Sequence, residues 1–514
     1  MQTKASRWEP KALVLALLAF GFDLPASAAD PTAIPPQPDA RAVPEFIGRE
    51  ATPNPVTSRA IPANPYMSTG SWSAPHDDTY MSDTYFTPGP LGKQPMKVFS
   101  TLLAEQDGND RIIGVGGATT VDSAGRLVVS VIKQNMTTGV AWSRLTLLDP
   151  ENLATLATMD LPAKVIPIGA RPTGIYLYQD AQYRTVIGTP LRTVWVVSHT
   201  ANSFSKEREY DLNLQTDTGM GIPADDDIQA LQPDFAGRLW FTSDKGVVGT
   251  LDMQTGQMLG SMQLPGERIV NGTAADEDGG VYIASTRAMY RFDADADGKP
   301  VVTWAEPYDA GTHVKAGQVD IGTGTTPTLM GGDYVTISDN AEPQMNVLVY
   351  RRAKEVQGPR LLCTVPVFKP GPSSNENSLV ATDRSIIVEN NYGYKDDKST
   401  SRGSTTKPGL ARIDVDSTGC RTKWTNREVN IPTVVTKMSL DTGLIYTYSK
   451  PKGPANTDAW YFTAIDFESG QIVYKQLAGT GGGFNNAYAA ITLGPDGTAY
   501  VGVMGGVVAI RDFR

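Results

Sequence analysis

The feature that most constrains this chain is a short pattern that recurs eight times: a tight turn followed by a run of β-forming residues. In the strong copies an aspartate stands in the turn and a glycine supplies the positive φ that such a turn needs. These strong copies lie at residues 122–129, 234–241, 276–283 and 495–501. Weaker copies begin at Arg192, Gly332, Asp383 and Gly443. A recurrence of this kind indicates a repeat architecture.

A second pattern follows most of these turns: a strand, an aspartate, a short polar turn and another strand. Aspartate at the start and glycine at the end are typical of hairpin turns. Copies lie at residues 148–152, 251–256, 292–298, 415–419 and 465–470. Each unit therefore holds about four antiparallel strands, which is the content of one propeller blade. We predict an all-β chain in which residues 96–514 form a single β-propeller, with eight four-stranded blades.

Closure of the ring gives this prediction an internal test. The last unit has strands at residues 497–503 and 507–511 and lacks a fourth. Residues 97–103 form a β-rich run that precedes the first full unit and belongs to none. We expect this N-terminal strand to complete blade eight, because closure removes an open sheet edge. Seven blades is the alternative, if residues 165–215 are an insertion.

The N-terminus predicts export. Lys4, Arg7 and Lys11 precede an apolar run at residues 12–22, and Ala26-Ser27-Ala28 offers a cleavage site. This order is typical of a secretory signal peptide over residues 1–28 and predicts a secreted or periplasmic protein. A short buried helix is the alternative. The apolar run is too short to cross a bilayer, and no later run reaches eighteen apolar residues, so we predict no membrane span.

Residues 29–95 predict an extended, proline-rich arm. Twelve of the 36 prolines lie between residues 31 and 90, and proline disfavours both long helices and central strands. The arm ends in two Asp-Thr-Tyr triplets, at residues 78–80 and 83–85, close to His76. Their tyrosines could dock on the propeller, since aromatic side chains are costly to leave in water. A solvated tail is the alternative.

Net charge and cysteine content limit which classes of partner and which cellular compartment we expect. The formal net charge is −10 and no basic run occurs, which disfavours nucleic acid and anionic membranes as partners. Cys363 and Cys420 are the only cysteines. In an oxidising compartment they would form a disulfide; two isolated buried thiols are the alternative.

Two segments resemble the repeat of quinoprotein-like (PQQ-type) propellers, namely residues 464–474 and 324–335. The resemblance implies the propeller fold rather than an activity. Quinone-dependent alcohol dehydrogenases of this fold carry two adjacent cysteines, which this chain lacks, and Tyr474 stands where their outer strand ends in tryptophan. No Cys-x-x-Cys-His haem site is present. These departures disfavour PQQ as a cofactor, because a cofactor enzyme must keep the groups that hold its cofactor.

No standard catalytic motif is present, and His76, His199 and His313 cannot be grouped by sequence. Polar loop residues at the expected channel mouth are the candidate site. They are Asp339, Asn340, Glu376, Asn377, Glu389, Asn390, Asn391, Asn485 and Asn486. Carboxylate and amide oxygens of this kind could bind a ligand or a calcium ion. Alternatively, Asn and Asp simply shape the loops. Asp225–Asp227 is interpreted as a solvated loop.

A second calcium candidate is the acidic turn of Asp293, Asp295 and Asp297, which matches the first half of an EF-hand loop. The twelfth position would be Trp304 rather than glutamate, so we expect at most a structural calcium there or a plain acidic turn.

Three functions follow from these features. The first is an exported propeller that binds a small molecule or a protein partner at the channel mouth. The alternative is a calcium-dependent hydrolase of lactonase or esterase type, in which Glu376, Asn340 or Asn390, and Asn486 converge on one ion. A PQQ-dependent oxidoreductase is least favoured.

Overall fold

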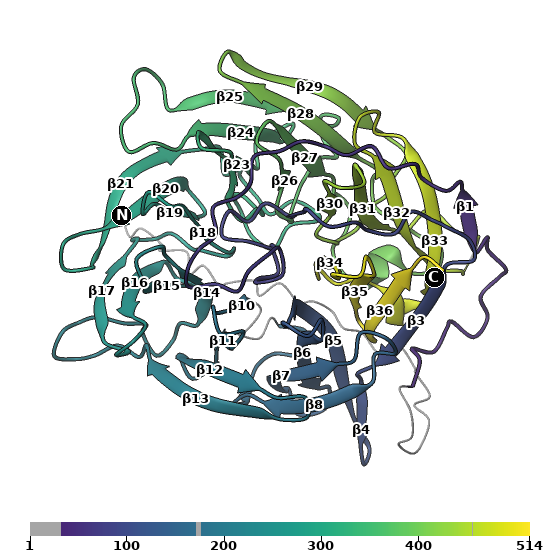
Figure 1. The fold of residues 1–514 in the computed structure, drawn as a ribbon, viewed down its shortest axis with the longest axis horizontal. Coiled ribbons are helices and arrows are strands. Elements are labelled where there is room, and N and C mark those ends of the chain that lie inside the picture. Colours follow the sequence, from purple (N-terminus) through teal and green to yellow (C-terminus); the bar gives the residue numbers. More distant parts are fainter. Residues whose placement is uncertain (1–31, 171–175, 455, 514) are drawn as a thin grey trace, which may run out of the picture.

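Eight four-stranded antiparallel sheets follow one another around a ring (Figure 1). The computed structural model describes residues 32–170, 176–454 and 456–513. The prediction of an eight-bladed β-propeller is therefore confirmed, and the seven-bladed alternative is wrong, because residues 165–215 contain a blade of their own. The predicted signal peptide, residues 1–28, lies outside the described residues.

In blades one to seven the innermost of the four blade strands comes first along the chain, and in blade eight the outermost strand comes first. Blade one contains β5 (Asp110–Val121), β6 (Leu127–Asn135), β7 (Val140–Leu148) and β8 (Thr155–Asp160), with the additions β4 (Glu105–Asp107) and β9 (Lys164–Val165). Blade two contains β10 (Leu177–Gln179), β11 (Thr185–Gly188), β12 (Thr193–His199) and β13 (Phe204–Asp211). Blade three contains β14 (Ile228–Pro233), β15 (Arg238–Ser243), β16 (Val247–Asp252) and β17 (Met258–Gln263). Blade four contains β18 (Ala274–Ala275), β19 (Val281–Ala284), β20 (Ala288–Ala294) and β21 (Pro300–Pro307).

The second half of the ring repeats the arrangement. Blade five contains β22 (Thr328–Met330), β23 (Tyr334–Ser338), β24 (Asn346–Arg351) and β25 (Leu361–Pro366). Blade six contains β26 (Val380–Ala381), β27 (Ser385–Glu389), β28 (Leu410–Asp416) and β29 (Gly419–Asn426), with the short 3-10 helix η1 (Asp397–Thr400) between β27 and β28. Blade seven contains β30 (Lys437–Ser439), β31 (Leu444–Ser449), β32 (Ala459–Asp466) and β33 (Ile472–Thr480). Blade eight contains β34 (Ile491–Leu493), β35 (Ala499–Val503) and β36 (Gly506–Arg511), preceded by η2 (Gly482–Phe484).

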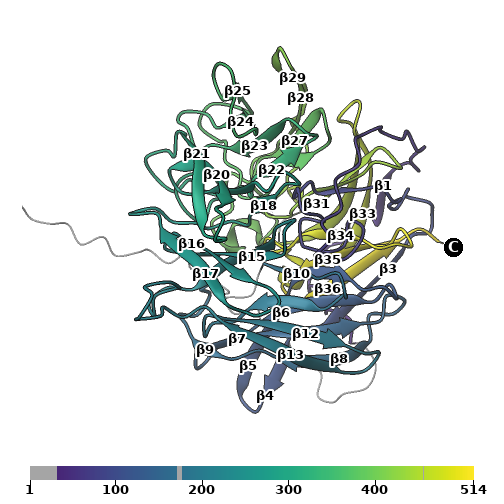
Figure 2. The ribbon, with the colours of Figure 1, turned by 60° about the vertical axis from the view of Figure 1, so that its left-hand side comes forward.

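The predicted closure is also present. β3 (Lys97–Leu102) pairs with β36 in antiparallel register, from Lys97 opposite Arg511 to Leu102 opposite Gly506. It is the outermost strand of blade eight, so the first and last strands of the propeller share one sheet. Figure 2 shows the ring turned by 60° from the view of Figure 1, with the β4–β5 hairpin projecting beyond its edge.

The recurring aspartate explains the turn between the first two strands of a blade. In blade three, Asp234 Oδ1 accepts hydrogen bonds from the backbone N–H groups of Ala236 and Arg238, at 2.9 and 3.0 Å. Arg238 Nε donates to Asp234 Oδ2 at 2.6 Å, and Gly237 has φ +88°. The aspartate thus satisfies backbone donors that the turn would otherwise leave unpaired.

Blade two corrects one detail of the sequence interpretation. The predicted marker at Arg192 belongs to the second hairpin, between β11 and β12, rather than to the first. The first turn is built by Asp180, whose Oδ1 accepts from the backbone N–H of Arg184 at 2.9 Å. Tyr183 takes the place of glycine at φ +58°, which hides the repeat from a search for glycine.

The apolar core lies between neighbouring blades rather than inside a central globule. One cluster joins Val186 and Val196 of blade two to Leu231 and Phe241 of blade three. Cys363 in β25 and Cys420 in β29 form the predicted disulfide, with a Cα–Cα separation of 6.1 Å, so it links the outer strands of blades five and six. Within the described ranges, no helix is both long and apolar enough to cross a membrane.

Candidate functional site

The proline-rich arm closes one end of the central channel. It runs from the rim, where β1 (Phe46–Gly48) pairs with β33, across the face of the ring (Figure 1). Four consecutive blades then donate backbone hydrogen bonds to it. The donors are the N–H groups of Ala275, Leu329, Ala381 and Met438, and the acceptors are the carbonyls of Thr79, Tyr80, Ser82 and Asp83, at 2.9–3.0 Å.

Both Asp-Thr-Tyr triplets of the arm are buried, in keeping with the docked alternative. The second triplet contributes β2 (Thr84–Tyr85), which pairs in parallel with β30 of blade seven. Ala275 ends β18 and Ala381 ends β26, so the arm lies at the C-terminal ends of the innermost strands. The arm therefore acts as a plug at that end of the channel.

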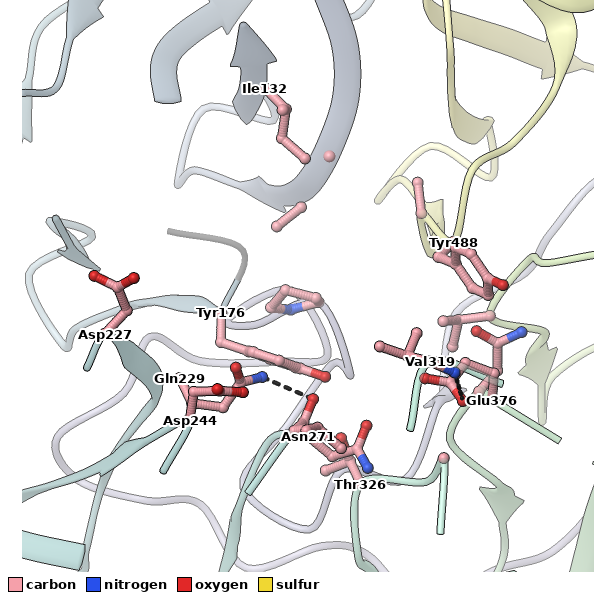
Figure 3. Close-up of a pocket in the computed structure, with 18 of the residues that line it drawn as sticks. Ile132, Tyr176, Asp227, Gln229, Asp244, Asn271, Val319, Thr326, Glu376 and Tyr488 are labelled. Atoms are coloured by element: carbon pink, nitrogen blue, oxygen red, sulfur yellow. Dashed lines mark hydrogen bonds between the residues drawn. The ribbon is translucent and has the colours of Figure 1, made fainter. Parts of the chain in front are cut away.

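A cavity of about 370 Å³ occupies the channel above this plug. Pro75 and His76 of the arm form its floor, and every blade contributes to its wall. Figure 3 shows Tyr176, Gln229 and Asn271 on one side of the space and Glu376 and Tyr488 on the opposite side. The apolar part of the wall comes from Val115, Ala118, Ile132, Val270, Val319, Val435, Ala487, Ala489 and Ala490.

The opposite end of the cavity has a charged rim. Asp225–Asp227 precedes the N-terminal end of β14, and Asp244, Lys245 and Arg268 lie beside it. Arg268 pairs with Asp244 at 2.6 Å and Lys245 pairs with Asp225 at 2.7 Å, so both cations are already neutralised. The Asp225 side chain is 79% exposed. The triplet interpreted as a solvated loop therefore forms part of the entrance.

Of the predicted site residues, those of blade six come together beside the cavity. Glu376 and Asn377 line it, and Glu376 Oε2 accepts a hydrogen bond from Val319 N–H at 3.0 Å. Glu389 lies behind them: its oxygens accept from the side chains of Asn377 at 2.5 Å, Asn391 at 3.1 Å and Thr436 at 2.5 Å. Burial raises the pKa of Glu389 to about 7.

The other predicted residues hold their own loops. Asp339 accepts from the backbone and side chain of Asn346, at 2.6 and 2.7 Å. The side-chain amides of the remaining asparagines donate to nearby groups: Asn340 to Ala310 O, Asn390 to Pro372 O, Asn485 to the Tyr394 hydroxyl, and Asn486 to Gly502 O. These contacts match the loop-forming alternative.

The acidic turn of blade four is likewise engaged within the protein. Asp293 pairs with Arg291 and with Lys354, each at 2.9 Å, while Asp295 accepts from the backbone N–H groups of Asp297 and Lys299, each at 2.9 Å. In the part of the chain that the structure describes, no three His, Cys, Asp or Glu side chains are grouped so as to hold a metal ion. Calcium binding stays a prediction, at this turn and at the channel mouth.

The lining does not fit pyrroloquinoline quinone. That cofactor carries three carboxylates and needs cations to hold them. Five acidic residues line this cavity against two basic ones, and the two cations, Lys245 and Arg268, already have carboxylate partners.

The floor contains a buried charged cluster that joins the arm to blades six and seven. Lys437 Nζ lies 2.7 Å from Asp77 Oδ1 and 2.5 Å from Asp83 Oδ1, and all three side chains are almost fully buried. His76 Nδ1 lies 3.1 Å from Asp83 Oδ1, and its Nε2 lies 3.3 Å from Ser378 Oγ. Burial raises the pKa of Asp77, although the Lys437 ammonium acts in the opposite direction.

Sequence reasoning missed most of the cavity wall, including Tyr176, Gln229, Asn271 and Thr326. A signal was available: Asn271, Thr326, Ser378 and Val435 each stand two or three residues before the innermost strand of their blade. Alignment of the repeats on the inner turns would have marked that position as facing the channel in blades four to seven.

Comparison with known proteins adds little beyond the fold. No family model matches the chain. An uncharacterized protein of Archaeoglobus fulgidus is 30% identical over 273 residues, which cover 48% of this chain and 52% of that protein. The chain thus matches about half the length of that relative.

Two solved structures are similar in outline. BamB from Moraxella catarrhalis gives a TM-score of 0.45 at 12% identity, with 81% of this chain and 97% of that chain covered. A streptogramin B lyase structure gives a TM-score of 0.38 at 11% identity, with the same two coverages. At such identities the likeness concerns the fold alone. The chain is, on its own topology, an eight-bladed β-propeller.

Proposed function

We propose that this protein is an exported propeller that binds a small molecule in its central cavity. The observation that carries the proposal is the arm, which converts an open channel into a cavity with a floor. Its volume, about 370 Å³, lies at the lower end of the range for small-molecule sites, so the ligand is small. Export rests on the signal-peptide pattern and agrees with the disulfide.

The lining narrows the chemistry of this ligand. A mostly apolar wall with a few polar groups favours a compact, partly apolar molecule that is fixed by one or two hydrogen bonds. The excess of acidic residues at the rim disfavours anions and favours a neutral or cationic ligand. The repeats resemble those of quinoprotein-like propellers. We propose this kinship for the fold alone, without a quinone cofactor.

A neutral fluorescent probe, N-phenyl-1-naphthylamine, tests the cavity directly. Val319 lines the cavity, so Val319→Trp should fill part of it and reduce probe affinity at least tenfold. Val314 lies in the same loop, is 44% exposed and is not part of the lining, which makes Val314→Trp the matched control. Equal probe binding by wild type and both variants, or no binding by folded wild type, would contradict the proposal.

A further inference from the structure

Three side chains at the cavity floor form a hydrogen-bonded line. Ser378 Oγ lies 3.3 Å from His76 Nε2, and His76 Nδ1 lies 3.1 and 3.2 Å from the two carboxylate oxygens of Asp83. A hydroxyl on one imidazole nitrogen and a carboxylate on the other is the arrangement that activates a serine nucleophile. The contact of 3.3 Å is at the long end of hydrogen-bonding distance, and catalytic hydrogen bonds of this kind often tighten when substrate binds.

The position of the line in the molecule suits catalysis. His76 and Ser378 both line the cavity, so a bound ligand can reach the hydroxyl and the imidazole. The Asp83 side chain is 0% exposed and lies behind the imidazole, away from the cavity. The centroid of the Tyr176 ring lies 6.1 Å from that of the His76 ring, so Tyr176 borders the imidazole in the cavity wall.

Charged groups are packed close to the imidazole. Two carboxylates, Asp77 and Asp83, share the single ammonium of Lys437, and Asp83 also contacts His76.

The backbone that presents these groups is strained. Asp77, Met81 and Asp83 have φ values of +73°, +55° and +56°, which residues other than glycine adopt at an energetic cost. Conformations of this kind gather at functional sites, where the surrounding structure holds them. Here they bring Asp83 beneath His76.

We infer that Ser378, His76 and Asp83 form a nucleophilic triad that hydrolyses small neutral acyl esters; the inference rests on the proposed ligand-binding role of the cavity. Ser378 and His76 are the catalytic residues, and Asp83 is a positioning residue that fixes the imidazole tautomer. A neutral ester fits the lining, because the acidic rim repels carboxylate substrates.

The reaction balances with water as the only co-reactant. Ser378 Oγ bonds to the carbonyl carbon of the ester and its proton passes to His76 Nε2. The bond from that carbon to the alcohol oxygen then breaks, and the alcohol leaves with the proton from His76. Water attacks the acyl-serine and gives a proton to His76. The bond to Ser378 breaks, the acid is released, and Ser378 regains its proton from His76.

The test combines labelling and turnover on the full mature protein. A fluorophosphonate is expected to label wild type at Ser378, located by peptide mass spectrometry. Hydrolysis of p-nitrophenyl butyrate is expected to fall at least a hundredfold in Ser378→Ala. Ser385 lies in the same blade, is also buried and donates to Asp414 at 2.9 Å, so Ser385→Ala is the matched control and should keep both signals.

Asp83→Asn has a separate readout. A positioning role predicts a lower kcat with a changed pH profile and unchanged probe affinity. Asp83 also pairs with Lys437, so this variant could fail to fold. In that case labelling of wild type decides: a folded wild type without label at Ser378, or Ser378→Ala with wild-type turnover, overturns the triad.

Failure of the triad is distinguishable from failure of the proposed function. Displacement of N-phenyl-1-naphthylamine by the butyrate ester is measured in Ser378→Ala. If the ester displaces the probe but wild type does not hydrolyse the ester, the triad is refuted and the proposed binding function is retained. Absence of probe binding by wild type would refute the cavity and the triad together.

Discussion

The inner turns of the blades and the plug formed by the arm both depend on buried aspartates, but these aspartates find their partners in different ways. Asp234 in blade three bonds to Arg238, four residues away. Asp83 in the plug bonds to Lys437, which is 354 residues away. The ring is thus specified by contacts that every repeat makes for itself, whereas the plug is specified by single contacts between distant segments.

The repeated turns therefore account for the stability of the ring, whereas the plug contributes to the site that we propose. A turn that recurs in the blades stabilises each of them but does not by itself create a functional site. The plug breaks the eightfold repetition, because it faces blades six and seven with His76, Asp77 and Asp83 and the other blades with different residues. The site lies where the unique segment meets the repeated one.

The largest loss of stability is expected from a substitution in the plug. Lys437→Met leaves two buried carboxylates without their cation, which should lower the free energy of unfolding by about 3–5 kcal/mol. The arm should become sensitive to protease before the ring unfolds in urea. Lys245→Met is the control, because Lys245 pairs with Asp225 at the exposed rim. Equal losses in the two variants would show that the buried cluster does not hold the arm.

A substitution in an inner turn of the ring should lower the free energy of unfolding by less. Asp234→Ala removes the acceptor for two backbone N–H groups and for Trp240 Nε1, which is buried, so we expect a loss of about 2 kcal/mol in urea unfolding. The arm and ring should still unfold together. Asp252→Ala in the exposed outer turn of the same blade should cost under about 1 kcal/mol. Premature release of the arm in Asp234→Ala would contradict local specification of the turn.

The polar network of blade six predicts a dependence on pH. Burial raises the pKa of Glu389 to about 7 from 4.5, so the folded state holds this proton more tightly than the unfolded state. Its contribution is fully present below about pH 4.5 and is lost as the pH rises through about 7. Asp78, whose pKa burial raises to about 6, acts in the same direction.

Glu389→Gln removes that contribution while an amide keeps the hydrogen bonds. Between pH 5 and pH 8 the variant should lose on the order of 2 kcal/mol less stability than wild type, measured by urea unfolding at each pH. Glu468→Gln, at a half-exposed surface carboxylate, is the control and should follow wild type. The same pH dependence in Glu389→Gln and wild type would refute the assignment.

The smallest effect is expected at the acidic turn of blade four. Asp293 is already paired with Arg291 and Lys354, so millimolar calcium or EDTA should leave the melting temperature within about 1 °C, a shift well below 1 kcal/mol. A larger shift that Asp293→Asn abolishes would instead support the structural calcium predicted for this turn.

Much of the fold could be predicted because its signals are local. The recurring turns, with aspartate in the four strong copies, marked seven of the eight first hairpins, and the unassigned strand at residues 97–103 predicted the closure of blade eight. Blade two escaped because Tyr183 adopts the conformation that glycine usually supplies. The site was predicted in part: Glu376 and Asn377 line the cavity, but Asp339, Asn340 and Asn486 hold loops instead.

The sequence alone determined the repeat and the number of strands in a blade, because each depends on residues a few positions apart. It also indicated the strand that closes the ring, because residues 97–103 belonged to no other repeat. The tertiary structure decided where the arm docks and which side chains meet beneath the cavity. His76 and Ser378 are 302 residues apart, and neither carries a pattern that names the other. Only the closed ring brings blades six and seven around the arm, and with them Ser378 and Lys437 to His76 and Asp83.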